Sequence, residues 1–190
     1  MNKINLLNNL EKKYSNCKLC EELSNNRLNV VFGGGNPDKC KIVIIGEAPG
    51  ANEDKNKIPF VGRSGKLLDG LLEEIGITRE EAYITNTILC KPPKNRDPKK
   101  DELKNCRERL NQQIKILNPK VVVTLGNFST KYLLETKEGI TKLRGKIFEK
   151  DGMKIIPCLH PAVLLYNGNS PKKRKEFQDD FNIIKKALKN

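Results

Sequence analysis

The chain has 190 residues, of which 37% are hydrophobic and 5% aromatic. This length supports one compact domain over residues 1–190 and excludes two large ones. No apolar run approaches the roughly 20 residues of a membrane-spanning helix, and the N-terminal segment lacks the apolar stretch of a secretory signal, so we expect a cytoplasmic protein without membrane contact.

The charge balance is strongly basic. The chain carries 36 Lys and Arg against 23 Asp and Glu, a formal net charge of +13. Such an excess favours polyanionic partners, because basic side chains displace the counterions condensed on phosphates. A general bias toward Lys explains the same excess, so charge alone leaves nucleic-acid binding open.

Helical and strand patterns alternate along the chain. In order, they predict a helix over 2–14, a strand over 41–46, a helix over 63–75, a strand over 82–87, a Pro-rich loop over 92–98, a helix over 99–117, a strand over 120–125, a helix over 126–134, a strand over 154–159, a polar loop over 167–173 and a helix over 176–188. This alternation predicts an α/β fold: a three-layer α/β/α sandwich with a central, mostly parallel four-stranded sheet.

Open α/β sheets bind ligands at the carboxyl ends of their strands. Those ends carry Gly46-Glu47-Ala48-Pro49-Gly50, Asn86, Gly126-Asn127 and His160-Pro161, so we expect one site where they converge. The glycine turn after the first strand matches neither the dinucleotide nor the phosphate-loop signature, so no nucleotide cofactor is predicted.

Two polar side chains at these strand ends suit recognition of a polar ring. His160, the only histidine, follows the fourth predicted strand, where an imidazole can hydrogen-bond a developing anion. Asn86 ends the second strand, and its carboxamide offers one donor group and one acceptor, as a nucleobase edge does. A structural histidine and ordinary turn chemistry are the alternative interpretations.

Six cysteines in a cytoplasmic chain favour metal or redox chemistry over disulfides. Cys17 and Cys20 form a CxxC chelating pair, and Cys90 and Cys106 add two thiols that adjoin charged residues. Four thiolates suit either zinc or an iron–sulfur cluster, and their spacing does not choose between them. The remaining two flank or lie within apolar strands and are predicted to be buried free thiols: Cys40 and Cys158.

Together these motifs resemble the family 4 uracil-DNA glycosylases, the iron–sulfur branch of their superfamily. The shared elements run in family order from Cys17 to Leu165: the CxxC pair, GEAPG at 46–50, Glu53-Asp54, PFVGRSGKLL at 59–68, YITN at 83–86, CKPP at 90–93, Asn95-Arg96, Cys106, Gly126 and HPAVLL at 160–165. The resemblance implies a DNA repair enzyme that flips uracil out of DNA and hydrolyses its N-glycosidic bond, leaving an abasic site. Independently of the resemblance, we expect the protein to act as a monomer.

The resemblance also implies roles for single residues. Phe60 is expected to stack on the flipped uracil, Asn86 to accept from N3–H and donate to O4, and His160 to stabilise negative charge on O2. The implied catalytic residues are His160, Glu47 and Glu53, and Glu47, Ala48 and Asn95 are implied to bind substrate beside the three residues above.

A metal site and a DNA-binding surface complete the expectations. The implied ligands of a structural [4Fe–4S] cluster are Cys17, Cys20, Cys90 and Cys106. The expected DNA contacts are Arg63, Ser64 and the basic segment Lys172, Lys173 and Arg174. One departure from the family pattern is Tyr166, which stands where many relatives carry Arg.

Three other interpretations remain open. The first is a glycosylase of the same superfamily that acts on deaminated purines, which a panel of substrates would distinguish. The second is a non-catalytic DNA-binding module with structural zinc, which leaves His160, Phe60 and the glycine turn unexplained. The third, a nucleotide-binding redox protein, lacks a dinucleotide-binding motif.

Overall fold

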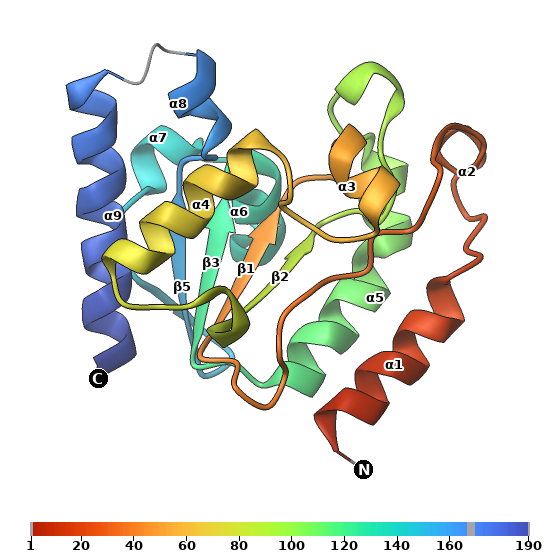
Figure 1. Ribbon diagram of the computed structural model, residues 1–190, viewed down its shortest axis with the longest axis horizontal. Coiled ribbons are helices and arrows are strands. Elements are labelled where there is room, and N and C mark those ends of the chain that lie inside the picture. Colours follow the sequence, from red (N-terminus) through yellow and green to blue (C-terminus); the bar gives the residue numbers. More distant parts are fainter. Residues whose placement is uncertain (1, 167–169, 190) are drawn as a thin grey trace.

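The computed structural model describes residues 2–166 and 170–189. A five-stranded sheet lies at its centre in the order β2-β1-β3-β5-β4 (Figure 1). The strands are β1 (Ile42–Gly46), β2 (Ala82–Asn86), β3 (Val121–Leu125), β4 (Phe148–Lys150) and β5 (Met153–Cys158). All pairings are parallel except that of β4 with β5.

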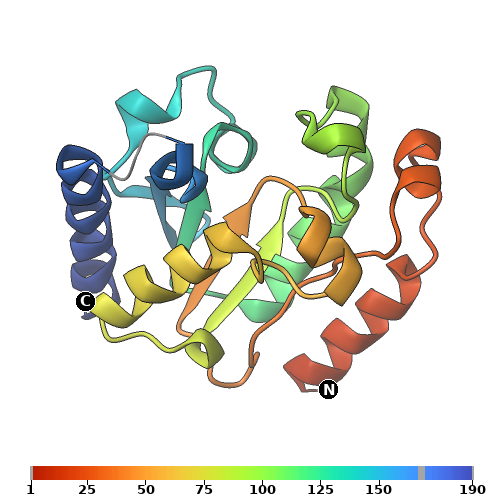
Figure 2. The same ribbon diagram turned by 45° about the horizontal axis from the view of Figure 1, so that its top comes forward.

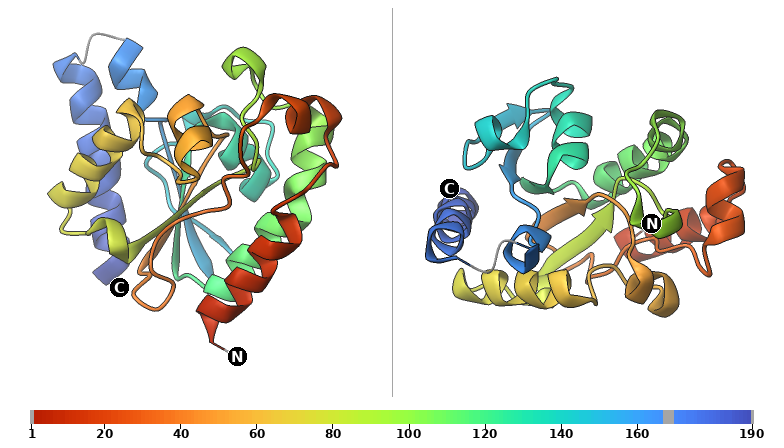
Figure 3. Two further views of the ribbon diagram at one scale, coloured as in Figure 1. Left: turned by 45° about the vertical axis from the view of Figure 1, so that its right-hand side comes forward. Right: turned by 90° about the horizontal axis from the view of Figure 1, so that it is seen from above.

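Helices cover both faces of this sheet, which makes three layers (Figure 3). On one face lie α4 (Arg63–Glu74), α7 (Ile140–Leu143), α8 (Ala162–Tyr166) and α9 (Pro171–Lys189), and on the other lie α1 (Lys3–Tyr14), α5 (Lys100–Leu117) and α6 (Asn127–Leu134). The short elements are α2 (Glu21–Asn26), α3 (Ala51–Asn56) and the 3₁₀ turns η1 (Arg79–Glu81) and η2 (Pro93–Asn95). No described helix is both long enough and apolar enough to cross a lipid bilayer.

Side chains alternate between the two faces of each strand, which gives the sheet a core on either side. Along β1, Ile42 and Ile44 pack against the layer of α4 and α9, whereas Val43 and Ile45 pack against the layer of α1 and α5. All four are fully buried. A strand with helices on both faces is buried on both, so it reads in the sequence as an unbroken apolar run.

The predicted three-layer α/β fold is confirmed, with two corrections. The sheet has five strands where four were predicted, because the short β4 adds an antiparallel edge strand beside β5. The loop predicted over 167–173 is wrong at its end: α9 begins at Pro171, residues 167–169 lie outside the described residues, and the Ser170 hydroxyl accepts from the Lys173 amide at 3.3 Å. Proline at a first helical position is favourable, since its missing N–H would have no intrahelical partner.

The two outer edges of the sheet are bounded differently. β4 pairs with β5 on one side. On the other side, Gly34 forms an isolated antiparallel bridge to Ile84 of β2, with reciprocal backbone hydrogen bonds of 2.9 and 2.7 Å. The carboxyl ends of β1, β2, β3 and β5 point to the same end of the sheet, where the turns that follow them come together (Figure 2).

Candidate active site

A cavity of about 470 Å³ opens at the carboxyl ends of the strands. Nine of the residues predicted from the sequence line it: Glu47, Ala48, Glu53, Phe60, Arg63, Ser64, Asn86, Asn95 and His160. The three remaining predicted DNA contacts do not line it but lie in the first turn of α9: Lys172, Lys173 and Arg174. The lining also includes Arg96, Leu165 and Tyr166, which the sequence reasoning did not assign to the site.

Asn86 presents an unused acceptor to this cavity. Its side chain is 1% exposed, and its Oδ1 atom has no hydrogen-bond partner among the described residues. A buried polar atom without a partner costs about 1–3 kcal/mol, which a ligand donor would recover. A Cβ atom at Gly46 would lie 2.4 Å from Oδ1, so only glycine leaves room for this carboxamide.

An aromatic ring forms one wall of the site. The centroids of the Phe60 and His160 rings are 5.6 Å apart, and their planes are inclined by 35°. Phe60 has a φ of 53°, a left-handed conformation that is rare for a bulky residue. Such backbone strain costs on the order of 1–3 kcal/mol and persists only where the surroundings impose it.

Two charged residues impose that conformation. The Arg79 guanidinium donates to the carbonyls of Pro59 and Phe60 and pairs with Asp69 at 2.6 Å. From the other side, the Glu53 carboxylate accepts the amides of residues 61 and 62 at 2.9 and 2.7 Å and that of residue 50 at 3.1 Å. The loop that carries Phe60 is therefore fastened on both sides to the glycine turn and to η1.

His160 is held as a neutral hydrogen-bond donor. Its Nδ1 atom accepts the backbone N–H of Ala162 at 3.2 Å, which leaves the proton on Nε2. Burial lowers the pKa of His160 to about 4, against the opposing charge of Glu53. At neutral pH the imidazole is uncharged and can donate one hydrogen bond from Nε2.

The two carboxylates of the site differ in their surroundings. Glu53 is occupied by its three backbone donors. Glu47, at the start of the turn after β1, makes no hydrogen bond or ion pair with another described side chain, and burial, with a smaller contribution from Asp97, raises its pKa to about 7. At neutral pH, therefore, the Glu47 carboxyl is present in both its protonated and its ionised form.

The four cysteines of the predicted metal site line one small cavity between the N-terminal segment, the Pro-rich loop and α5. The Arg27 guanidinium donates to Cys90 Sγ at 2.9 Å, and the Asn105 amide donates to Cys20 Sγ at 3.3 Å. Burial raises the pKa of both thiols, that of Cys90 to about 11, and these two donors oppose the effect of burial. Across residues 2–166 and 170–189, no three His, Cys, Asp or Glu side chains converge tightly enough for a single metal ion.

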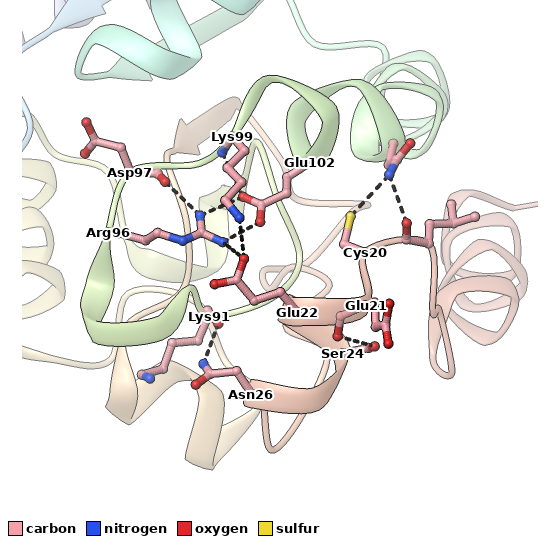
Figure 4. Close-up of polar contacts among 12 residues, drawn as sticks. Cys20, Glu21, Glu22, Ser24, Asn26, Lys91, Arg96, Asp97, Lys99 and Glu102 are labelled. Carbon is pink, nitrogen blue, oxygen red and sulfur yellow. Dashed lines mark hydrogen bonds and ion pairs between the residues drawn. The ribbon is translucent and has the colours of Figure 1, made fainter.

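An ion-pair network joins the cysteine region to the cavity (Figure 4). Arg96, which lines the cavity, donates to both carboxylate oxygens of Glu102 at the start of α5 and to Glu22 of α2. Lys99 also pairs with Glu22. The Glu102 side chain is 3% exposed, so this part of the network is protected from solvent. It fastens the segment after Cys20 to the Pro-rich loop of the site.

Comparison with known proteins decides the family. The model of the uracil DNA glycosylase superfamily matches residues 32–183. The chain belongs to this superfamily. It is 44% identical to a type-4 uracil-DNA glycosylase of Sulfurisphaera tokodaii over 94% of this chain and 83% of the relative. Type-4 enzymes of Saccharolobus solfataricus and Thermotoga maritima are each 43% identical, over 99% and 92% of this chain and 88% and 91% of theirs.

These relatives place the chain on the type-4 branch, as its motifs predicted. Several residues that shape the glycosylase site were not found by sequence reasoning. Arg79 and Arg96 act on carbonyls and carboxylates that lie far away along the chain or on other elements, which no local pattern reveals. Gly46 was noted as part of a turn, but its contact with Asn86 appears only in three dimensions.

The two cysteines outside the cavity that the other four line are free thiols, as predicted. Cys158 is buried, whereas Cys40 is only partly buried.

Proposed function

We propose that this protein excises uracil from DNA by hydrolysing the N-glycosidic bond. The observation that carries the proposal is the unpaired Asn86 Oδ1 in the cavity, flanked by the Phe60 ring and a neutral His160. This set matches uracil: an acceptor for N3–H, an apolar face for the ring and a donor for a carbonyl oxygen. The type-4 relatives, all named uracil-DNA glycosylases, support the same activity.

The chemistry follows from where charge develops. A base inside the duplex is out of reach, so the enzyme flips it out at a cost of a few kcal/mol, and stacking on Phe60 returns about 1–3 kcal/mol. Bond cleavage leaves a uracil anion and a cationic sugar. The Nε2–H of His160 stabilises the anion, and one preorganised donor of this kind contributes about 10²–10³ in rate.

Glu47 is the proposed group that meets the sugar and its water. Its carboxylate has no competing side-chain partner among the described residues and titrates near neutrality, so it can stabilise the cationic sugar and accept a proton from water. Glu53 is proposed to act on the protein itself, because its three backbone bonds hold the Phe60 loop. Ala48 and Asn95 line the cavity and are proposed to bound the uracil pocket.

Discrimination against cytosine follows from the same carboxamide. Cytosine offers an acceptor at N3 and an amino donor in place of O4, so the Asn86 orientation that suits uracil would leave both of its groups mismatched. A mismatched buried polar pair costs about 1–3 kcal/mol for each group.

We propose that Cys17, Cys20, Cys90 and Cys106 hold a [4Fe–4S] cluster. The cavity that the four thiols line, the two side-chain donors to their sulfurs and the type-4 relatives support it. When bound, the cluster supplies cross-linking rather than chemistry at the uracil site. Iron and sulfide analysis of anaerobically purified protein, with its visible spectrum, tests this proposal, and a colourless zinc protein would contradict it.

DNA is the proposed partner, and the cytoplasm the proposed location. The net charge of +13 supports a polyanionic partner, and Arg63 and Ser64, which line the cavity, are proposed to contact the phosphate backbone. Lys172, Lys173 and Arg174 are proposed as outer phosphate contacts on α9. The enzyme is proposed to act as a monomer, because one chain supplies every residue of the site.

A labelled oligonucleotide with a single uracil tests the activity. We expect cleavage after alkali at uracil, but not at cytosine or thymine. His160→Ala should slow cleavage about 10²–10³-fold while DNA affinity is retained. Gly70→Ala, on α4, where a Cβ meets nothing within 4 Å, serves as the control. Absence of cleavage by cluster-loaded protein, in single- and double-stranded DNA alike, would contradict the proposal, and hypoxanthine in the same position would then test the deaminated-purine alternative.

A further inference from the structure

The Pro-rich loop between β2 and α5 contains two consecutive residues in the left-handed conformation. Lys94 has a φ of 51° and Asn95 a φ of 53°. Asparagine tolerates this backbone, but lysine seldom adopts it, because its Cβ atom then crowds the following carbonyl. Both side chains are exposed to solvent, so neither conformation is imposed by the packing of its own side chain. Strain of this kind persists only where neighbouring contacts hold the backbone.

The contact that holds this loop comes from the next residue, Arg96. Its guanidinium donates to both carboxylate oxygens of Glu102, at 3.0 and 2.6 Å, and to Glu22 at 2.9 Å (Figure 4). The Glu102 side chain is 3% exposed, and it also accepts the backbone amide of Lys99 at 2.8 Å. A two-pronged pair between an arginine and a carboxylate is strong and fixed in direction. Arg96 therefore ties the residue beside Asn95 to the first turn of α5.

Arg96 lines the cavity, but its N–H groups are engaged elsewhere. Nη1 donates to Glu102 and to the carbonyl of Asp97 at 2.9 Å, and Nη2 donates to Glu102 and Glu22. These four bonds match the four Nη–H groups of a guanidinium. The Nε–H is shielded from solvent and has no hydrogen-bond partner among the described residues. The guanidinium therefore offers a DNA phosphate no exposed and uncommitted N–H group.

We propose that Arg96 is a positioning residue that holds Asn95 against the flipped nucleotide. Asn95 lines the cavity together with Asn86 and His160. Its position depends on the strained backbone at Lys94 and at Asn95 itself, which the pairing of Arg96 maintains. Without that pairing, Lys94 would return to an ordinary backbone conformation, and the Asn95 carboxamide would leave the cavity. This inference rests on the proposed excision of uracil.

A double-mutant cycle tests whether Arg96 acts through Asn95. Single-turnover cleavage of a uracil oligonucleotide is measured for wild type, Asn95→Ala, Arg96→Met and the double variant. Each single substitution should slow cleavage about tenfold. The double variant should be no slower than Asn95→Ala, because residues that act as one unit are not additive. A double variant about a hundredfold slower than wild type would overturn the inference, and so would wild-type cleavage by Asn95→Ala.

Lys99→Met is the matched control, because Lys99 belongs to the same ion-pair network. The substitution removes the exposed pair between Lys99 and Glu22 but leaves the pair between Arg96 and Glu102 in place. This variant should cleave at the wild-type rate, since an exposed ion pair contributes little. Slowing equal to that of Arg96→Met would ascribe the effect to the network as a whole and would overturn the inference.

The strain itself is tested by Lys94→Gly, because glycine adopts the left-handed conformation without a steric penalty. In the Arg96→Met background, this substitution should recover most of the lost cleavage rate. In the Asn95→Ala background it should recover nothing, since the carboxamide is absent. A failure to recover cleavage in the Arg96→Met background would overturn the inference.

Loss of Arg96 alone leaves the buried Glu102 carboxylate unpaired, which can prevent folding. Arg96→Met combined with Glu102→Gln removes both charges, and it replaces Arg96→Met in every comparison if the single variant does not fold. The slope of log K against log salt for DNA binding by this variant should match wild type. A slope smaller by about one would make Arg96 a direct phosphate contact and overturn the inference. A wild type that leaves uracil DNA uncleaved refutes the proposed function itself and is therefore distinct from these outcomes.

Discussion

The Asn86 carboxamide oxygen lies 2.4 Å from the point that a Cβ atom at Gly46 would occupy, and the Phe60 ring lies 2.6 Å from the same point. Asn86 and Gly46 are register partners at the ends of β2 and β1. The absence of a side chain at Gly46 therefore leaves the space that the Asn86 carboxamide and the Phe60 ring occupy.

Gly46→Ala should lower cleavage of uracil DNA by at least one order of magnitude, because the methyl group must displace either Asn86 or Phe60. Gly70→Ala is the control, since a Cβ there meets nothing within 4 Å, and a glycine-to-alanine change inside a helix stabilises by about 0.5–1 kcal/mol. Single-turnover cleavage and thermal unfolding of both variants check the prediction. Cleavage at the wild-type rate by Gly46→Ala would show that the site accommodates a methyl group at residue 46.

Glu47→Gln should lower activity but raise stability at high pH. Burial raises the carboxyl pKa from its usual 4.5 to about 7 in the folded protein. Ionisation of the unfolded chain therefore erodes the stability of the wild type as pH rises from 4.5 to 7, and the deficit stays constant above that. The amide does not ionise, so the melting temperatures should coincide near pH 4 and separate in favour of the variant at pH 8. Equal melting temperatures at pH 8 would contradict the burial argument.

Arg79→Met should slow cleavage about tenfold with little change in DNA affinity. The substitution removes the hydrogen bonds to the carbonyls of Pro59 and Phe60. The left-handed conformation of Phe60 costs about 1–3 kcal/mol, so its backbone should relax once these bonds are lost. Lys41→Met, which breaks the exposed ion pair to Glu81, is the control, because pairs of that kind contribute about 0–1 kcal/mol. The rate and the affinity are measured separately on a uracil oligonucleotide. Rapid cleavage by Arg79→Met would mean that Glu53 alone suffices to hold the loop.

The basic end of α9 should contribute to DNA affinity in a salt-dependent way. Lys172→Ala and Arg63→Ala should each reduce the slope of log K against log salt by about one. Lys186→Ala, exposed in the last turn of the same helix at its other end, should leave the slope unchanged. Binding titrations at several salt concentrations check this. Equal slopes for all three variants would show that DNA affinity depends on overall charge and not on Arg63 and Lys172 in particular.

The sequence predicted the fold wherever apolar pattern governs it. The four long strands begin and end within one residue of prediction, because each is centred on a short apolar stretch that lies between two helical layers. β4 was not predicted, because it has three residues, of which two are charged and none is buried. The start of α9 was missed because Ser170-Pro171, a good helix start, lies in a stretch that is otherwise polar.

The site was predictable to the extent that it rests on ordered motifs. Nine of the residues that these motifs predicted line one cavity. The motifs did not reveal the hydrogen bonds that hold the backbone around this cavity. Arg79 and Arg109 bind backbone carbonyls on neighbouring elements, and any residue can supply a carbonyl, so their partners leave no trace in the local sequence.

The strands at the two edges of the sheet bear on whether the protein aggregates at high protein concentration. An uncovered edge strand presents a row of free amides and carbonyls to which another chain can add, which is a common start of aggregation. Here β4 occupies one edge and the Gly34 bridge the other. Gly35 next to it has a φ of 132° and sits against β2, where a Cβ would lie 2.2 Å from the Ala82 carbonyl. The edge strand β4 is short and carries two charged residues, and one backbone bridge occupies part of the β2 edge, and both features limit the pairing of another chain with this sheet.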